Sequence, residues 1–115
     1  MSLTKTTLSC LALATHLLSI SHVIASDADL SVERKNELNH IVKQDCGSCH
    51  GMTLKGGLGP ALLPENLEGK PVLFLQHTIL FGRAGTAMPP WKTLLTEQEA
   101  LWISQQLKAG KITEK

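Results

Sequence analysis

Apolar side chains recur at helical spacing in three stretches of the chain, which predicts three helices. The first helix runs from Ser31, a residue type that caps helix N-termini, into Cys46. The second covers residues 71–82, a compact apolar run that a proline opens and a glycine closes. The third opens at a capping box formed by Thr96 and Glu99. No stretch alternates with the period of a strand, so the sequence predicts an all-α fold of three to four helices.

Two long segments between these helices are rich in glycine and proline. They cover residues 50–71 and 83–95, and both are expected to be mostly loop. Loops longer than about a dozen residues are uncommon in a compact domain unless they bind something. We therefore expect the two loops to form a binding site.

The N-terminal segment, residues 1–25, has the composition of a secretory signal peptide. Lys5 is its one charged residue, and an apolar run from Leu8 to Ile20 precedes the short side chains that end at Ala25. A membrane span needs about 20 solidly apolar residues, and this run is shorter and contains polar residues. We predict cleavage after Ala25, which leaves residues 26–115 as one domain without a membrane anchor.

The mature chain is nearly neutral and poor in aromatic residues. The full sequence has 11 Lys and Arg and 10 Asp and Glu. Since the signal peptide removes Lys5 and no acid, the two signs balance, and no basic stripe indicates nucleic-acid binding. The chain has two Phe, two Trp and no Tyr. A domain this small with so few large side chains usually needs a cofactor, metal or disulfide to complete its core.

The segment "CGSCH", residues 46–50, carries the candidate chemistry. A reactive dithiol usually begins a helix in a β-α-β scaffold, whereas this pair ends a helix in a chain without strand patterns. A structural zinc site needs four ligands, and no second pair of Cys or His follows. A disulfide between Cys46 and Cys49 closes almost no loop and stabilises little. Covalent haem attachment fits best: both thiols add to the haem vinyl groups, and His50 supplies an axial ligand to the iron.

Met88 and His77 are the two candidates for the other axial position. Met88 lies in "GTAMPPW", where two prolines hold the backbone and small residues leave room for the haem ring. A thioether is a weak neutral ligand, so it needs a backbone that keeps it in place. His77, on the apolar helix, is the alternative. Met52 is too close to His50 in sequence, and His40 is expected at the surface.

Three further contacts are expected around the haem. The carbonyl of Gly59 or Pro60 is a candidate acceptor for the Nδ1 hydrogen of His50, which would orient the imidazole. Trp91 either donates its indole hydrogen to a haem propionate or only packs. Arg83 either pairs with a propionate or is solvated.

The stretches "CGSCHG", "GGLGPAL" and "GTAMPPW", in this order, resemble the class I c-type cytochromes. More narrowly, "CGSCHGMTLKGGLGPAL" and "TAMPPW" resemble the small periplasmic cytochromes c55X (NirC). The resemblance implies the class I cytochrome c fold, with long loops around one covalent haem c. It implies that Cys46 and Cys49 attach the haem and that His50 and Met88 ligate the iron.

The resemblance also implies which residues pack and which face a partner. The first and last helices are expected to cross near the haem, with Leu38 or Ile41 against Trp102. Loop residues are expected to form an apolar rim around the exposed haem edge, with candidates Met52, Leu54, Ala87 and Pro89.

The function implied by the resemblance is electron transport rather than catalysis. Such cytochromes are monomeric periplasmic carriers that meet a redox protein partner, here cytochrome cd1 nitrite reductase in denitrification. An assembly factor in haem d1 maturation is the alternative. A haem peroxidase or gas-binding protein is a further alternative, but no acid–base pair accompanies Met88 in the sequence.

Overall fold

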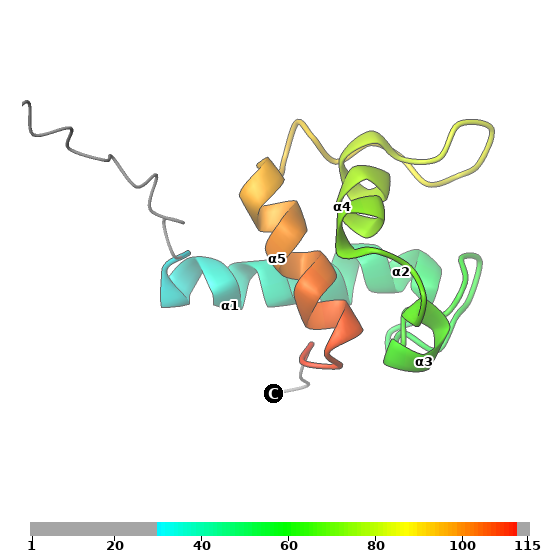
Figure 1. Cartoon of the computed structure of the whole chain (residues 1–115), viewed down its shortest axis with the longest axis horizontal. Helices are drawn as coiled ribbons and strands as arrows, with labels where there is room; N and C mark the ends of the chain where they lie inside the picture. The colour runs from blue at the N-terminus through cyan, green and yellow to red at the C-terminus, as the bar shows by residue number, and fades with distance from the viewer. Residues whose placement is uncertain (1–29, 113–115) are drawn as a thin grey trace, which may run out of the picture.

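The computed structural model describes residues 30–112, and all regular structure in this range is helical. The signal peptide predicted for residues 1–25 lies outside the described residues. None of the described helices is long and apolar enough to cross a membrane. The all-α prediction is confirmed for the described range. Its elements are α1 (Val32–Ile41), η1 (Val42–Cys46), α2 (Gly47–His50), α3 (Pro64–Leu67), α4 (Val72–Phe81) and α5 (Glu97–Lys108) (Figure 1).

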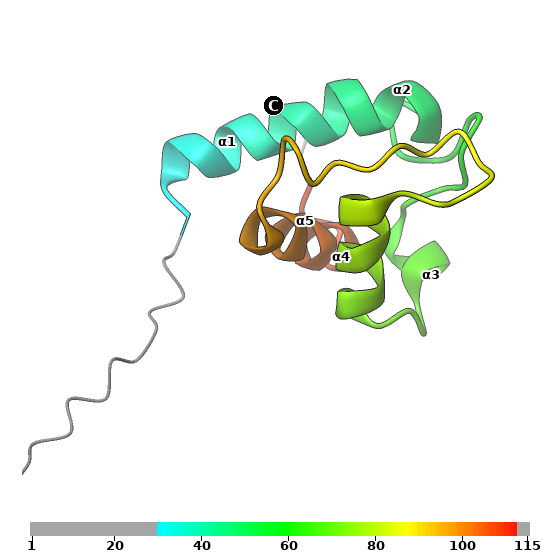
Figure 2. The same cartoon turned by 90° about the horizontal axis from the view of Figure 1, so that it is seen from above.

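The first three elements form one continuous helical rod that ends at the "CGSCH" segment (Figure 2). Ser31 caps its start, because the Ser31 hydroxyl accepts a hydrogen bond of 3.1 Å from the Arg34 backbone N–H. The predicted helix is therefore confirmed at its start and continues past Cys46 to His50. Its middle segment, η1, is a π-helical turn, an irregularity that often occurs next to functional residues.

Helices α4 and α5 begin and end close to where the sequence predicts. Pro71 is the N-cap of α4 and stands just before its first turn. The predicted capping box at the start of α5 is confirmed: the Thr96 hydroxyl accepts from the Glu99 N–H at 3.2 Å, and the Glu99 carboxylate accepts from the Thr96 N–H at 2.7 Å. These bonds satisfy donors that a helix N-terminus otherwise leaves unpaired.

The short helix α3 lies in the segment that the sequence analysis assigned mostly to loop. Pro64 occupies its first turn, a position where the missing N–H of proline has no cost. Lys108 on α5 donates to the carbonyls of Leu67 at 2.9 Å and Lys70 at 2.6 Å. This lysine therefore ties the end of α3 to the C-terminal helix.

The core forms where α5 crosses α1 and packs along α4 (Figures 1 and 2). Leu38 is fully buried there, and Ile41 and Trp102 are half-buried against the same cluster, which agrees with the predicted crossing of the first and last helices. The buried members of the cluster are Leu38, Val42, Leu54, Leu67, Leu75, Leu95, Ile103 and Leu107.

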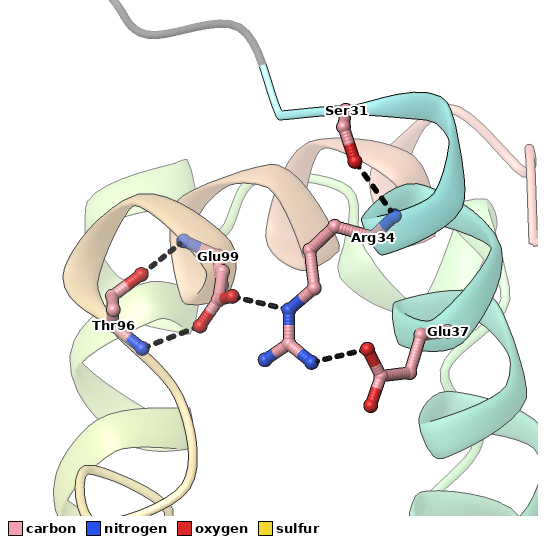
Figure 3. A network of polar contacts seen from close by, with 5 residues as sticks. All are labelled: Ser31, Arg34, Glu37, Thr96 and Glu99. Atoms are coloured by element: carbon pink, nitrogen blue, oxygen red, sulfur yellow. Dashed lines mark hydrogen bonds and ion pairs between the residues drawn. The ribbon is translucent and has the colours of Figure 1, made fainter.

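A polar link joins the two ends of the described chain beside this crossing (Figure 3). The Arg34 guanidinium donates to the Glu99 carboxylate at 2.5 Å and pairs with Glu37 at 2.7 Å. Glu99 is buried, and its pKa is lowered mainly by the hydrogen bond from Arg34. The same bond raises the pKa of Arg34.

Candidate haem-binding site

Both cysteines of the motif lie at the end of the rod, where η1 passes into α2. Cys46 and Cys49 are three residues apart on helical backbone, so their side chains fall on one side of the helix. Both thiols are free and half-buried. Burial raises the pKa of the Cys46 thiol to about 11. Within residues 30–112, no group of three or more His, Cys, Asp and Glu side chains is arranged to hold a metal ion.

His50 closes α2, and the glycine-rich loop that follows holds its ring. The His50 Nδ1 lies 2.7 Å from the Pro60 carbonyl oxygen, so of the two acceptors that the sequence suggested, Pro60 makes the contact. A hydrogen on Nδ1 donates to this oxygen, which leaves Nε2 with a free lone pair for a metal. A Cβ at Gly59 would lie 2.8 Å from both Nδ1 and Cε1 of the ring, so only glycine permits this approach.

The loop around His50 is closed by backbone hydrogen bonds as well. The Gly56 N–H donates to the His50 carbonyl, and the Gly59 N–H donates to the Cys49 carbonyl, each at 2.8 Å. These carbonyls belong to the last turn of the rod and would otherwise have no intrahelical partner. The predicted loop is therefore ordered by the helix that carries the motif.

Met88 lies in the second long loop, which leaves α4 at Gly82 and returns to it. The Met88 carbonyl accepts from the Arg83 N–H at 3.2 Å, and the Met88 N–H donates to the Thr86 hydroxyl at 3.3 Å. The Trp91 N–H then donates to carbonyls in the last turn of α4 at 3.1 Å. The backbone on both sides of Met88 is thus held, as the sequence analysis expected.

A cavity of about 750 Å³ lies between these segments. This volume falls within the roughly 300–1,000 Å³ typical of small-molecule sites. Cys46, Cys49 and His50 line it from the rod, and Met88 lines it from the second loop. Its remaining lining is mostly apolar and includes Leu62, Leu67, Leu75, Ile79, Ile103 and Leu107.

The other candidate residues differ in whether they line the cavity. His77 is exposed, does not line the cavity, and lies beside Phe81 with 4.6 Å between ring centroids. His40 is exposed, as expected. Trp91 and Arg83 both line the cavity.

The expected apolar rim needs a correction. Ala87 and Pro89 are exposed and line the cavity, whereas Met52 is exposed but lies outside its lining. Leu54 is only 8% exposed and belongs to the hydrophobic core, so its assignment to the rim was wrong. Leu58, which the sequence analysis did not single out, lines the cavity and is 92% exposed. An apolar residue flanked by glycines in "GGLGP" was the signal that could have found it.

Comparisons with known proteins agree with this geometry. The family described as "Cytochrome C oxidase, cbb3-type, subunit III" matches residues 33–105. Cytochrome c55X of Pseudomonas aeruginosa is 51% identical over 87 residues, which cover 76% of this chain and 73% of that protein. The solved structure of the c-type cytochrome NirC superposes with a TM-score of 0.72 at 49% identity, over 74% of this chain and all of that one. The chain belongs to the cytochrome c55X family. A more distant similarity, at 33% identity and a TM-score of 0.56, links 60% of this chain to 15% of dihydro-heme d1 dehydrogenase NirN in complex with DHE.

Membership in the cytochrome c55X family gives the cofactor and the class of function. The chain is a c-type cytochrome with one covalently bound haem c, and it serves as an electron carrier for a redox protein partner rather than as an enzyme. The described residues fit this cofactor. Two thiols at the required spacing, an imidazole with its Nδ1 already bonded, and a large apolar cavity occur together.

Proposed function

We propose that this cytochrome c55X is exported to the periplasm and donates electrons to cytochrome cd1 nitrite reductase through a haem held by His50 and Met88. In this proposal Cys46 and Cys49 form the two thioether links. The observation that carries it is that His50 and Met88, from segments far apart in sequence, line one cavity while the backbone of each is held by hydrogen bonds. Haem c supplies a one-electron couple, and His/Met ligation raises its potential.

Other residues of the chain orient His50, exclude water from the cavity and contact the haem propionates. Pro60 fixes the tautomer and orientation of the His50 imidazole through the bond of 2.7 Å and makes the ring a stronger ligand. Buried apolar side chains such as Ile103 exclude water from the cavity. Trp91 and Arg83, which line the same cavity, are the proposed partners of the haem propionates.

A pair of variants tests the axial ligands. Ferric His/Met haem shows a weak near-infrared band from sulfur-to-iron charge transfer, and Met88→Ala should abolish it. His77→Ala is the control, because His77 is exposed and outside the cavity lining, and it should leave the band unchanged. A missing band in the unmodified protein, together with a bis-histidine spectrum that His77→Ala changes, would reverse the assignment.

The proposed periplasmic location and the proposed redox partner are supported by different observations. Residues 1–25 have the composition of a signal peptide, and residues 26–115 form the proposed mature monomer. The surface near the cavity offers Leu58, Ala87 and Pro89 as exposed apolar contacts. Transient redox complexes bury little surface, so a small apolar patch suffices.

Rapid mixing tests the donor role directly. The reduced holoprotein is mixed with oxidised cytochrome cd1 nitrite reductase, and oxidation of haem c is followed by absorbance. The proposal predicts a second-order reaction with weak dependence on ionic strength, because the mature chain is nearly neutral. Absence of electron transfer at micromolar reductase would contradict it.

A role in haem d1 maturation is the second candidate function. It is favoured by the similarity to dihydro-heme d1 dehydrogenase NirN in complex with DHE. Deletion of the gene separates the two roles. A reductase that lacks haem d1 in the deletion strain supports maturation, whereas a reductase that contains haem d1 but is reduced slowly supports the donor role.

A further inference from the structure

The last turn of α4 holds the Met88 loop at two places. At the far end of the loop, the N–H groups of Trp91 and Lys92 donate to the Leu80 carbonyl, each at 3.1 Å. This carbonyl is one that the helix itself leaves without a partner. At the near end, the chain leaves α4 through Gly82, whose N–H donates to the Thr78 carbonyl at 2.9 Å.

Gly82 makes room for the backbone that carries Met88. Its φ is 67°, in the left-handed region that glycine adopts readily. A Cβ at this position would lie 2.6 Å from the Met88 carbonyl oxygen, 2.7 Å from the Pro89 carbonyl carbon and 2.9 Å from the Pro90 nitrogen. All three atoms belong to backbone, and two prolines stiffen it, so the segment cannot avoid the added carbon by rotating a side chain.

Gly69, outside the loop, provides a comparison. Its φ of 73° is also positive. A Cβ at Gly69, however, would meet no atom within 4 Å. An added Cβ therefore contacts the Met88 segment at Gly82 and meets open space at Gly69.

We infer that Gly82 is a positioning residue for the iron ligand: the absence of its side chain sets how closely the Met88 backbone approaches α4, and with it the reach of the thioether into the cavity. The inference rests on the proposed axial role of Met88. Alanine at Gly82 pushes the Met88–Pro89–Pro90 backbone away from α4 and weakens the sulfur–iron bond. Alanine at Gly69, outside the loop, leaves that bond intact.

The test uses the mature holoprotein with covalent haem, in the unmodified form and as Gly82→Ala and Gly69→Ala. The first readout is the near-infrared sulfur–iron band of the ferric state. The second is cyanide affinity, because cyanide competes with Met88 for ferric iron. We expect Gly82→Ala to lose most of the band and to bind cyanide on the order of tenfold more tightly, which corresponds to about 1.4 kcal/mol. The Gly69→Ala control should keep the band and the affinity of the unmodified protein.

A double variant separates an effect through Met88 from general loosening of the fold. In a Met88→Ala background the ligand is already absent, so adding Gly82→Ala should leave cyanide affinity unchanged if Gly82 acts through Met88. A further tenfold increase in that background would overturn the inference. If Gly82→Ala does not accumulate as holoprotein, Gly82→Asn replaces it, because asparagine tolerates a positive φ while still carrying a Cβ.

Failure of the Gly82 inference can be distinguished from failure of the proposed function. A missing band in the unmodified protein contradicts Met88 as ligand, and hence the proposed function itself. A normal band in the unmodified protein that is retained in both Gly82 variants contradicts the role of Gly82 alone. Equal loss of the band in the Gly82 and Gly69 variants would show that contact with the Met88 segment is not responsible.

Discussion

The ion pair between Arg34 and Glu99 is expected to contribute more to stability than any other polar contact in the described chain. It joins residues 65 positions apart and links α1 to α5 beside their crossing (Figure 3). The perturbation is Arg34→Met, which keeps much of the aliphatic stem of the side chain but removes the guanidinium. The Glu99 carboxylate then stays buried and keeps only the hydrogen bond from the Thr96 N–H.

The expected loss in the free energy of unfolding follows from the exposure of the Arg34 and Glu99 side chains. Breaking a fully buried pair costs about 3–5 kcal/mol, and breaking an exposed pair costs about 0–1 kcal/mol. The Glu99 side chain is 9% exposed and that of Arg34 is 28% exposed, so this pair falls between the two cases. We expect Arg34→Met to lower the free energy of unfolding by about 2 kcal/mol at pH 7, a value between these two limits.

The matched control is Glu37→Gln, which removes the other carboxylate that pairs with Arg34. The Glu37 side chain is 61% exposed, so its loss should lower the free energy of unfolding by at most about 0.5 kcal/mol. Urea unfolding of the holoproteins, followed by far-ultraviolet circular dichroism, measures both values. In a thermal scan, about 1 kcal/mol corresponds to roughly 4–8 °C for a domain of this size.

The pH dependence of the free energy of unfolding gives an independent check on the role of this ion pair. Arg34 lowers the pKa of Glu99 in the folded protein below its ordinary value of 4.5, so the pair stabilises the fold fully above that pH. As pH falls through the lowered folded pKa, Glu99 becomes protonated and the stabilisation is lost. The difference between the unmodified protein and Arg34→Met should therefore shrink below about pH 4.5. Equal destabilisation by Arg34→Met and Glu37→Gln, or a difference that does not change with pH, would refute the reasoning.

Three further predictions concern the haem site and the core. Gly59→Ala places a Cβ 2.8 Å from the His50 ring, so we expect a displaced imidazole, seen as a reduction potential or ferric spin state that differs from the unmodified protein; an unchanged spectrum and potential would contradict this. Leu38→Ala empties a fully buried position and should lower the free energy of unfolding by about 2–5 kcal/mol, whereas a loss below about 1 kcal/mol would mean that the helix crossing is not well packed. Thr96→Ala removes one half of the capping box and should cost about 1 kcal/mol in urea unfolding; a neutral result would show that Glu99 alone caps α5.

Features coded by neighbouring residues were predictable from the sequence. Ser31 as a cap, the capping box of α5 and the glycine that ends α4 each depend on residues within one turn of each other. The Pro60 contact with His50 was also anticipated, because a short glycine-rich loop returns to the helix that it leaves. These are local interactions whose geometry follows from short spacing.

Features that depend on distant parts of the chain were not predicted. Helix α3 forms inside a segment rich in glycine and proline, and Lys108 of α5 holds its end. Leu54 has a positive φ of 58°, unusual for leucine, yet it is buried in the core, since tertiary packing there outweighs its local preference. The partner of Arg34 could not be chosen from sequence either, because many carboxylates lie at greater separation and helical spacing favours only Glu37.

The intact mass of the protein recovered from the periplasm, measured with its visible spectrum, tests the central claim most directly. The account predicts the mass of a polypeptide beginning at Ser26 plus one haem, with the haem retained after denaturation and lost from a variant in which Cys46 and Cys49 are both alanine. A colourless protein with the mass of the bare polypeptide, obtained from cells that attach haem to another c-type cytochrome, would contradict it.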